Sequence, residues 1–177
     1  MELLLGMLRD LGRHVRTDVE ELDAEALRWR PHPNANSIGV TVWHLARWFD
    51  LMAHRILRGG ADTDELWQRD GWASRTGYDP RGIGTNGWGA VTGYTVEEVA
   101  RIPELSSADL LSYYDSTIAA LTKAVNDLGA DGLARPPAGA AGERTALQRL
   151  TSLIEGEFGH LGEIRALKSL RGHILAD

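Results

Sequence analysis

Hydrophobic and polar positions along the chain follow a helical period over most of its length. Between residues 3 and 22 the apolar positions recur every three or four residues, with Arg and Glu on the other side, which is typical of an amphipathic helix. The same period returns in three further stretches: 38–58, 106–128 and 144–171. Ser37 and Ser106 are suitable N-caps for two of them. Without any strand pattern, the chain is predicted to be all-α, a four-helix bundle.

The segment 61–104 follows neither a helical nor a strand period. It is rich in Gly and in aromatic residues, whereas disordered segments are poor in aromatics. We therefore expect an ordered insertion between the second and third long helices, packed over the core and containing a short helix at 95–102. Trp43 and Trp48, five positions apart, cannot share one helix face, so one of them is predicted to pack under the insertion. The whole of 1–177 is predicted to be a single domain.

Composition excludes several classes of function. The formal net charge is −6 and no basic stripe is present, which argues against nucleic acid as a partner. No apolar run approaches the roughly 20 residues of a membrane span, and the N-terminus does not resemble a signal peptide. The chain contains no cysteine, so it has no disulfide, thiolate ligand or cysteine nucleophile. A cytoplasmic, soluble protein is expected.

The last long helix contains an unusual stretch, "IEGEFGHLGEIRAL" at 154–167. Gly156, Gly159 and Gly162 each cost a helix interior roughly 1 kcal/mol relative to alanine. Such a series is expected where another backbone, from a neighbouring helix or a second subunit, comes close, or where a non-protein group does.

His44 and His160 are the candidate functional residues. His44 shares its helix face with apolar residues, and His160 lies beside the apolar arc of the last helix with Glu157 and Glu163 about one turn away. Two imidazoles and a carboxylate suit Zn²⁺, Ni²⁺ or Fe²⁺ with an open position. The alternative is a hydrogen-bonded core histidine and solvated glutamates. His14 and His54, with charged neighbours, are predicted to be solvated.

Two stretches resemble the DinB-like superfamily of helical bundles, which includes the YfiT-type hydrolases and thiol-dependent transferases such as mycothiol-dependent maleylpyruvate isomerase. They are "SIGVTVWHLARWFD" and "HLGEIRALKSLRG". The middle of the chain, from "WASRTGYDPRG" to "YTVEEVARIPELSSADLLSYYDSTIAAL", is similar to members that have a Trp/Gly-rich insertion.

This resemblance implies a divalent metal bound by three histidines. Two of these positions correspond to His44 and His160, whereas the third corresponds to Gly156. Either Glu157 or Glu163 supplies a carboxylate instead, with Glu157 preferred, or the space at Gly156 admits a ligand, a water that completes the metal shell or a Trp from the insertion, or the site is vestigial. If Glu163 is not a ligand, it is expected to orient the residues next to His160 from outside the set of metal ligands.

The resemblance further implies a metal-dependent thiol transferase or hydrolase, with a low-molecular-weight thiol as co-substrate and a homodimeric assembly. No residue stands out as a dedicated nucleophile. The alternative is a non-catalytic dimeric bundle with a degenerate metal site, which binds an apolar small ligand or acts as a stress or interaction module.

Overall fold

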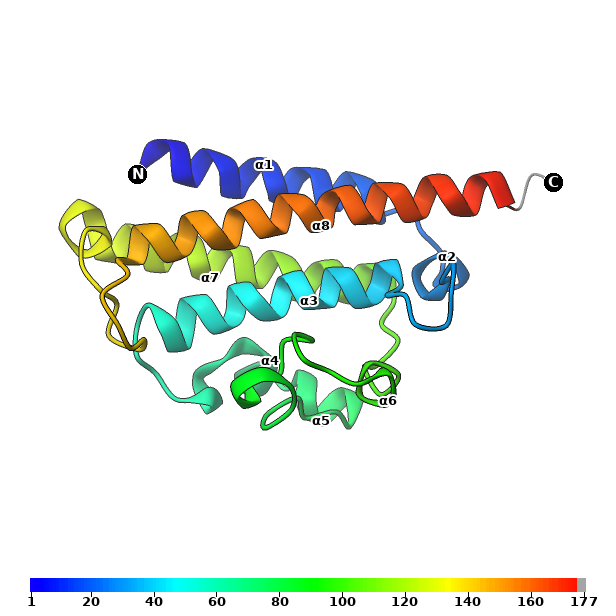
Figure 1. Ribbon diagram of the computed structural model, residues 1–177, viewed down its shortest axis with the longest axis horizontal. Coiled ribbons are helices and arrows are strands. Elements are labelled where there is room, and N and C mark those ends of the chain that lie inside the picture. The colour runs from blue at the N-terminus through cyan, green and yellow to red at the C-terminus, as the bar shows by residue number, and fades with distance from the viewer. Residues whose placement is uncertain (175–177) are drawn as a thin grey trace.

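The computed structural model describes residues 1–174, with side chains as far as Gly172, and every regular element in that range is a helix. The prediction of an all-α chain is confirmed. Four long helices lie side by side (Figure 1). They are α1 Glu2–Val19, α3 Ile38–Leu51, α7 Ser107–Leu133 and α8 Ala146–Ile174.

The long helices form where the sequence pattern places them. The predicted apolar stripe of α1 is buried from Leu4 to Val19, and burying each such side chain stabilises the fold by about 1.5–3 kcal/mol. Ser37 Oγ accepts a hydrogen bond from Val40 N at 3.3 Å, and Ser106 Oγ accepts one from Asp109 N at 3.1 Å. Both predicted caps are therefore confirmed.

The middle of the fold is formed by α3, which is buried on nearly every side. Such a helix must be covered on all faces, and here α7 and α8 cover one side. The helix continues into η1, a π-helical turn over Met52–Ile56, closed by a hydrogen bond from Leu57 N to Met52 O. π-helical turns are frequent at functional sites.

The segment between α3 and α7 carries short helices and loops that cover another side of α3 (Figure 1). Trp43 of α3 packs edge-on against Trp67 and Tyr78 of this segment, with ring centroids 5.5 and 5.8 Å apart. Trp43 thus lies under the insertion, and Trp48 contacts the insertion as well, through Trp88 at a centroid distance of 5.4 Å. The short elements of this segment are η2 Asp62–Asp64, α4 Leu66–Arg69, α5 Trp72–Thr76, η3 Thr85–Gly87 and α6 Val96–Val99. One further short helix, α2 Ala24–Arg28, lies between α1 and α3.

The glycines of α8 do not serve a helix–helix seam within the chain. A Cβ added to Gly156, Gly159 or Gly162 would meet no atom within 4 Å outside the local helix backbone, and all three positions are exposed. The expectation that a neighbouring helix approaches them is therefore wrong for the described residues. Close approach by a second subunit or a ligand stays a prediction.

Over the described range no helix combines the length and apolar character that crossing a bilayer requires.

Candidate functional site

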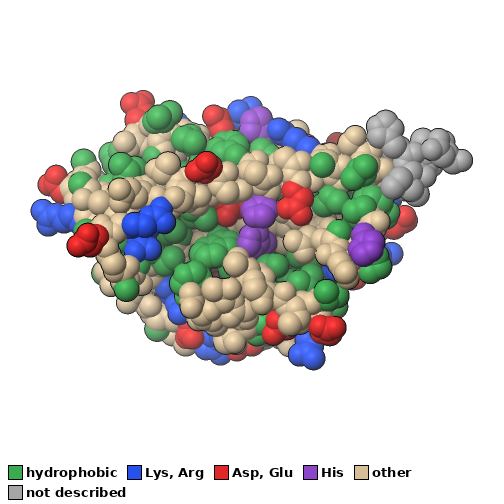
Figure 2. Space-filling model, viewed as in Figure 1, with side chains coloured by type: hydrophobic (Ala, Val, Ile, Leu, Met, Phe, Trp, Pro, Cys, Tyr) green, Lys and Arg blue, Asp and Glu red, His purple; other side chains and the backbone are tan. Residues whose placement is uncertain are grey.

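The two candidate histidines meet between α3 and α8. His44 Nε2 and His160 Nε2 lie 3.2 Å apart, and the two rings are nearly perpendicular, at 85° with centroids 4.7 Å apart. Figure 2 shows two adjacent histidine side chains on this face of the molecule. Both rings are partly buried, because His44 lies beneath the insertion and His160 beside the apolar arc of α8.

The other nitrogen of each ring is held by an acceptor. His44 Nδ1 lies 2.5 Å from the carbonyl oxygen of Ala90, in the insertion, and His160 Nδ1 lies 2.9 Å from Glu163 Oε2. A carbonyl oxygen only accepts hydrogen bonds. The hydrogen bond from His160 lowers the pKa of Glu163, so this carboxylate accepts as well. Each Nδ1 therefore carries a proton and donates it.

This arrangement leaves two lone pairs facing each other. A neutral imidazole protonated at Nδ1 has only an acceptor at Nε2. Burial, reinforced by the nearby His160, lowers the pKa of His44 to about 4, so His44 is neutral at pH 7. Two acceptors 3.2 Å apart repel each other unless a cation lies between them, either a proton on His160 or a metal ion.

The separation of the two nitrogens fits a shared metal ion. Nitrogen ligands about 2.1 Å from one tetrahedral metal lie about 3.4 Å from each other, close to the 3.2 Å found here. Metal-binding histidines also donate their second N–H to a carboxylate or carbonyl, as both rings do. The third ligand is not in place, since the described residues contain no group of three or more His, Cys, Asp or Glu side chains arranged to hold a metal.

Glu157, the predicted third ligand, lies in the same region without contacting either ring by a hydrogen bond. Its side chain is only 2% exposed, and its Oε2 has no hydrogen-bond partner. Burial raises the pKa of Glu157 well above its ordinary value, and its charge in turn contributes to the raised pKa of Tyr114. A buried carboxyl group without a partner is costly, and Glu157 lines the same cavity as the two histidines.

A cavity of about 390 Å³ opens at the histidine pair. Trp48 of α3 and Trp88 of the insertion stand edge-to-face on its wall, with centroids 5.4 Å apart. Gly156 also lines the cavity, so the missing side chain on α8 leaves space at its opening. The lining residues are His44, Trp48, Met52, Ile56, Trp88, Thr92, Arg144, Arg149, Ser152, Leu153, Gly156, Glu157 and His160.

Arg47 fixes the part of the insertion that holds His44. Its side chain is fully buried, and it donates to the carbonyl oxygens of Trp88 at 3.4 Å and Gly89 at 2.9 Å. The next carbonyl, that of Ala90, accepts from His44. Three consecutive peptide carbonyls of the insertion are therefore bound by two residues of α3, one turn apart.

The charge of Arg47 is balanced inside the protein. Its guanidinium lies 2.5 Å from Glu65 Oε2 and 3.2 Å from Asp50 Oδ2. Burial disfavours the charged form, but Tyr113 and these two carboxylates hold the pKa of Arg47 above its ordinary value.

His54 belongs to the same buried cluster. It donates to Asp50 Oδ1 from Nδ1 at 2.9 Å and is 5% exposed. The prediction that His54 is solvated is therefore wrong, because the insertion covers the helix face on which it lies. Sequence reasoning also missed Arg47, since an arginine four residues after a tryptophan carries no pattern that predicts burial.

The backbone next to Ala90 is strained. Val91 has φ of 67°, a conformation that costs a β-branched residue about 1–3 kcal/mol and persists only where the surroundings impose it. The anchoring of the three preceding carbonyls supplies that constraint.

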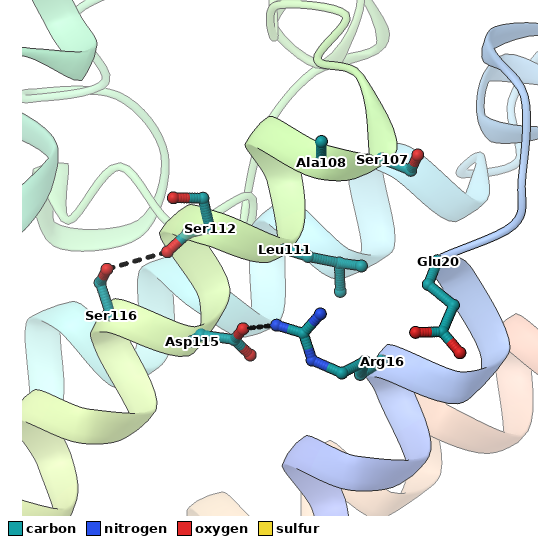
Figure 3. Close-up of a pocket in the computed structure, with 8 residues that line it drawn as sticks. All are labelled: Arg16, Glu20, Ser107, Ala108, Leu111, Ser112, Asp115 and Ser116. Carbon is teal, nitrogen blue, oxygen red and sulfur yellow. Dashed lines mark hydrogen bonds and ion pairs between the residues drawn. The ribbon is translucent and has the colours of Figure 1, made fainter.

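A second cavity, of about 590 Å³, lies elsewhere, between α1 and α7. Figure 3 shows Arg16 reaching across it from α1 to an ion pair with Asp115 of α7, while Ser116 Oγ donates to the Ser112 carbonyl at 2.8 Å. Both members of the ion pair are more than a third exposed. This surface groove contains no convergent catalytic or ligand groups, so the smaller cavity at the histidines is the candidate site.

The fold is a helical bundle in which side chains of two facing helices, His44 of α3 and His160 of α8, meet beside a cavity. The sequence profile of the DinB superfamily matches residues 7–164. The chain belongs to the DinB superfamily, and the resemblance seen in the sequence is confirmed.

A solved structure is similar to this protein over nearly the full chain. The crystal structure of a conserved protein from Enterococcus faecalis aligns with a TM-score of 0.78, covering 96% of this chain and 95% of its own, at 19% sequence identity. At that identity the similarity concerns the fold alone. Among curated proteins no sequence matches this chain.

Proposed function

We propose that this protein is a divalent-metal-dependent enzyme that acts on a small molecule, as a thiol-dependent S-transferase or a hydrolase. The observation that supports this most directly is the pair of Nε2 atoms 3.2 Å apart, each belonging to a ring whose Nδ1 proton is already donated elsewhere. Membership of the DinB superfamily supports the same reading.

His44 and His160 would hold the metal, Zn²⁺, Ni²⁺ or Fe²⁺, through Nε2, with the carboxyl group of Glu157 as third ligand. A metal bound there supplies a Lewis acid that makes water or a low-molecular-weight thiol nucleophilic near neutral pH. The unpartnered Oε2 of Glu157, about one turn before His160, is a carboxylate oxygen available to bind the metal. Gly156, one residue earlier, leaves space for the substrate.

The remaining residues of the site orient the histidines and exclude water. Glu163 fixes His160 through Nδ1, and the Ala90 carbonyl fixes His44 in the same way. Holding both rings in one tautomer keeps both Nε2 lone pairs directed at the same point. Trp48 and Trp88 form an apolar wall that shields this point from bulk water.

A second candidate function is a binding protein without catalysis, whose metal site is degenerate. The absence of a three-donor group among the described residues favours it, because two imidazoles alone bind a metal weakly. The cavity would then take an apolar small ligand against its two tryptophans.

Metal analysis separates the two functions. Protein purified without an affinity tag and incubated with Zn²⁺, Ni²⁺ or Fe²⁺ under reducing conditions should retain about one equivalent of one of these metals after desalting. His44→Ala and His160→Ala should each abolish retention. Glu157→Gln should weaken it by about tenfold or more, since loss of even an outer-shell partner of a metal ligand costs about 10–100-fold in affinity. His32→Ala, which removes an exposed histidine in a turn, is the matched control and should retain metal as the wild type does.

The enzymatic reading fails if none of the three metals is retained. It fails equally if retention survives both histidine substitutions in folded protein, as judged by circular dichroism. Retention that is lost in both histidine variants but unaffected by Glu157→Gln would assign the third position to water or substrate.

A further inference from the structure

The cavity at the histidine pair carries positive charge on the side toward the start of α8. Arg144 and Arg149 line it, together with Ser152. Figure 2 shows a Lys/Arg patch on the same face as the two histidines, with hydrophobic side chains in the hollow between them. The proposed chemistry at the histidines does not use these two arginines.

The two guanidinium groups are oriented without being neutralised. Arg144 Nη2 donates to Ser152 Oγ at 2.6 Å and to the Gln148 carbonyl at 3.0 Å. Arg149 Nη2 donates to the Ala141 carbonyl at 2.6 Å, and its Nε to the Arg144 carbonyl at 3.3 Å. Neither forms an ion pair with a carboxylate of the described residues, and Nη1 of each has no acceptor among them. Both groups therefore retain charge and donors for an external anion.

Their position adds to the local positive potential. Arg144 and Arg149 flank the N-terminus of the long helix α8, whose first turn contains no acidic residue. Helix N-termini already carry about half a positive charge and favour Asp and Glu there. The positive charges of the two arginines repel each other and are also unfavourable beside the positive end of the helix dipole. A bound anion reduces both repulsions.

The spacing limits the shape of that anion. Arg149 and His160 are eleven positions apart on one helix, about 16 Å along its axis at 1.5 Å per residue. The cavity wall includes an apolar stretch formed by Trp48, Trp88 and Leu153, alongside the polar residues Thr92, Ser152 and Glu157. An inorganic anion cannot reach both ends, whereas an elongated molecule with an apolar middle can.

We propose that the substrate, or the thiol co-substrate, is an elongated organic anion whose carboxylate or equivalent acidic group binds Arg144 and Arg149. Its apolar or aromatic middle lies against Trp48 and Trp88, and its far end reaches the histidine pair. Placing the reactive end of the ligand at the histidine pair rests on the proposed function. The anion site itself depends only on the arginines and the tryptophans.

Isothermal titration with three phenylalkanoates, phenylacetate, 4-phenylbutyrate and 6-phenylhexanoate, each against its neutral primary amide, tests the assignment. At least one acid should bind the wild type about tenfold or more tightly than its amide, since a charge-assisted bidentate contact is lost in the amide. The double variant Arg144→Gln/Arg149→Gln should bring the ratio to about one. Arg9→Gln/Arg13→Gln, which removes the same charge from the exposed face of α1, should leave the ratio unchanged.

The histidine double variant His44→Ala/His160→Ala separates this proposal from the metal site. It should lose metal and keep the preference for the acid. The proposal would be overturned if the preference for the acid over its amide disappeared in the histidine double variant but persisted in the arginine double variant. That result would place the carboxylate at the histidines. Three acids that bind no more tightly than their amides would overturn the proposal as well. A wild type that retains no metal but prefers the acid through the arginines would refute the metal-dependent function and leave the anion site standing.

Discussion

Replacing Arg47 with methionine should destabilise the protein severely. It should also disturb His44 indirectly, through the backbone of the insertion. The substitution keeps much of the side-chain volume but removes the guanidinium group that binds the carbonyls of Trp88 and Gly89. It also leaves Glu65 and Asp50 buried without their cation.

The expected loss of stability in Arg47→Met depends on which hydrogen-bond partners each carboxylate keeps. Asp50 retains hydrogen bonds from the amides of Leu66 and Trp67, at 2.8 and 3.0 Å, and from the Tyr113 hydroxyl at 2.8 Å. Glu65 retains only a long contact with Arg55 at 3.4 Å. Removing one partner of a buried ion pair costs about 3–5 kcal/mol, and most of that cost falls on Glu65.

Urea denaturation monitored by circular dichroism measures this cost by linear extrapolation. Arg47→Met should lower the free energy of unfolding by about 3–5 kcal/mol. Arg47→Met/Glu65→Met, which removes both charges, should be more stable than Arg47→Met alone. Arg47→Lys keeps the positive charge but lacks the planar guanidinium group, so its free energy of unfolding should lie between those of the wild type and Arg47→Met.

A second measurement concerns His44. In the wild type, ¹⁵N chemical shifts of the imidazole should report an Nδ1-protonated tautomer, because the Ala90 carbonyl accepts from Nδ1. In Arg47→Met that signature should weaken, since the carbonyls beside Ala90 lose their anchor. A loss of stability below about 1 kcal/mol would refute the assigned burial cost. A variant as destabilised as expected but with an unchanged His44 tautomer would refute the link between Arg47 and the site.

Two further predictions concern α8 and the buried carboxylate. Gly159→Ala should raise the free energy of unfolding by up to about 1 kcal/mol, because the new methyl group meets no atom within 4 Å beyond the local helix backbone; a lower thermal midpoint, accompanied by a change in sedimentation, would instead reveal a partner subunit against this face. Asp50→Asn should destabilise at pH 7 and lose less stability than wild type on acidification. Burial raises the pKa of Asp50, but the stronger effect of His54, Arg47 and two backbone amides lowers it, so its contribution is present above the unfolded pKa of about 3.9 and is lost as the pH falls through the lower folded value. Urea midpoints that shift in parallel for both proteins below about pH 4 would contradict this.

Periodicity was sufficient to predict the long helices, and the side-chain caps Ser37 and Ser106 also marked the starts of α3 and α7. The helical wheel also places His44 and His160 on inward faces, and the structure brings their rings into contact. Whether a metal binds between them stays a prediction. Glu157 illustrates the limit of the wheel, which gives its direction but not whether its carboxyl group reaches the rings.

The contacts of the insertion could not be predicted in the same way. A segment with no period gives no register, so nothing in the sequence indicates that the Ala90 carbonyl meets His44 or that Arg47 binds the two preceding carbonyls. The burial of His54 was missed for the same reason. Long-range backbone contacts of this kind depend on loop geometry, including the left-handed conformation of Val91.

The buried charges around Arg47 also position the backbone that holds the site. An apolar core under the insertion would pack well but would hold the Trp88–Ala90 backbone only through non-directional contacts. Arg47 instead binds two carbonyls with fixed directions, and Glu65 and Asp50 keep its charge in place. Replacing a buried ion pair with apolar residues often stabilises a protein, so a buried arginine here is better explained by positioning than by stability. The site that depends on it then has His44 neutral, with Nε2 aimed at His160.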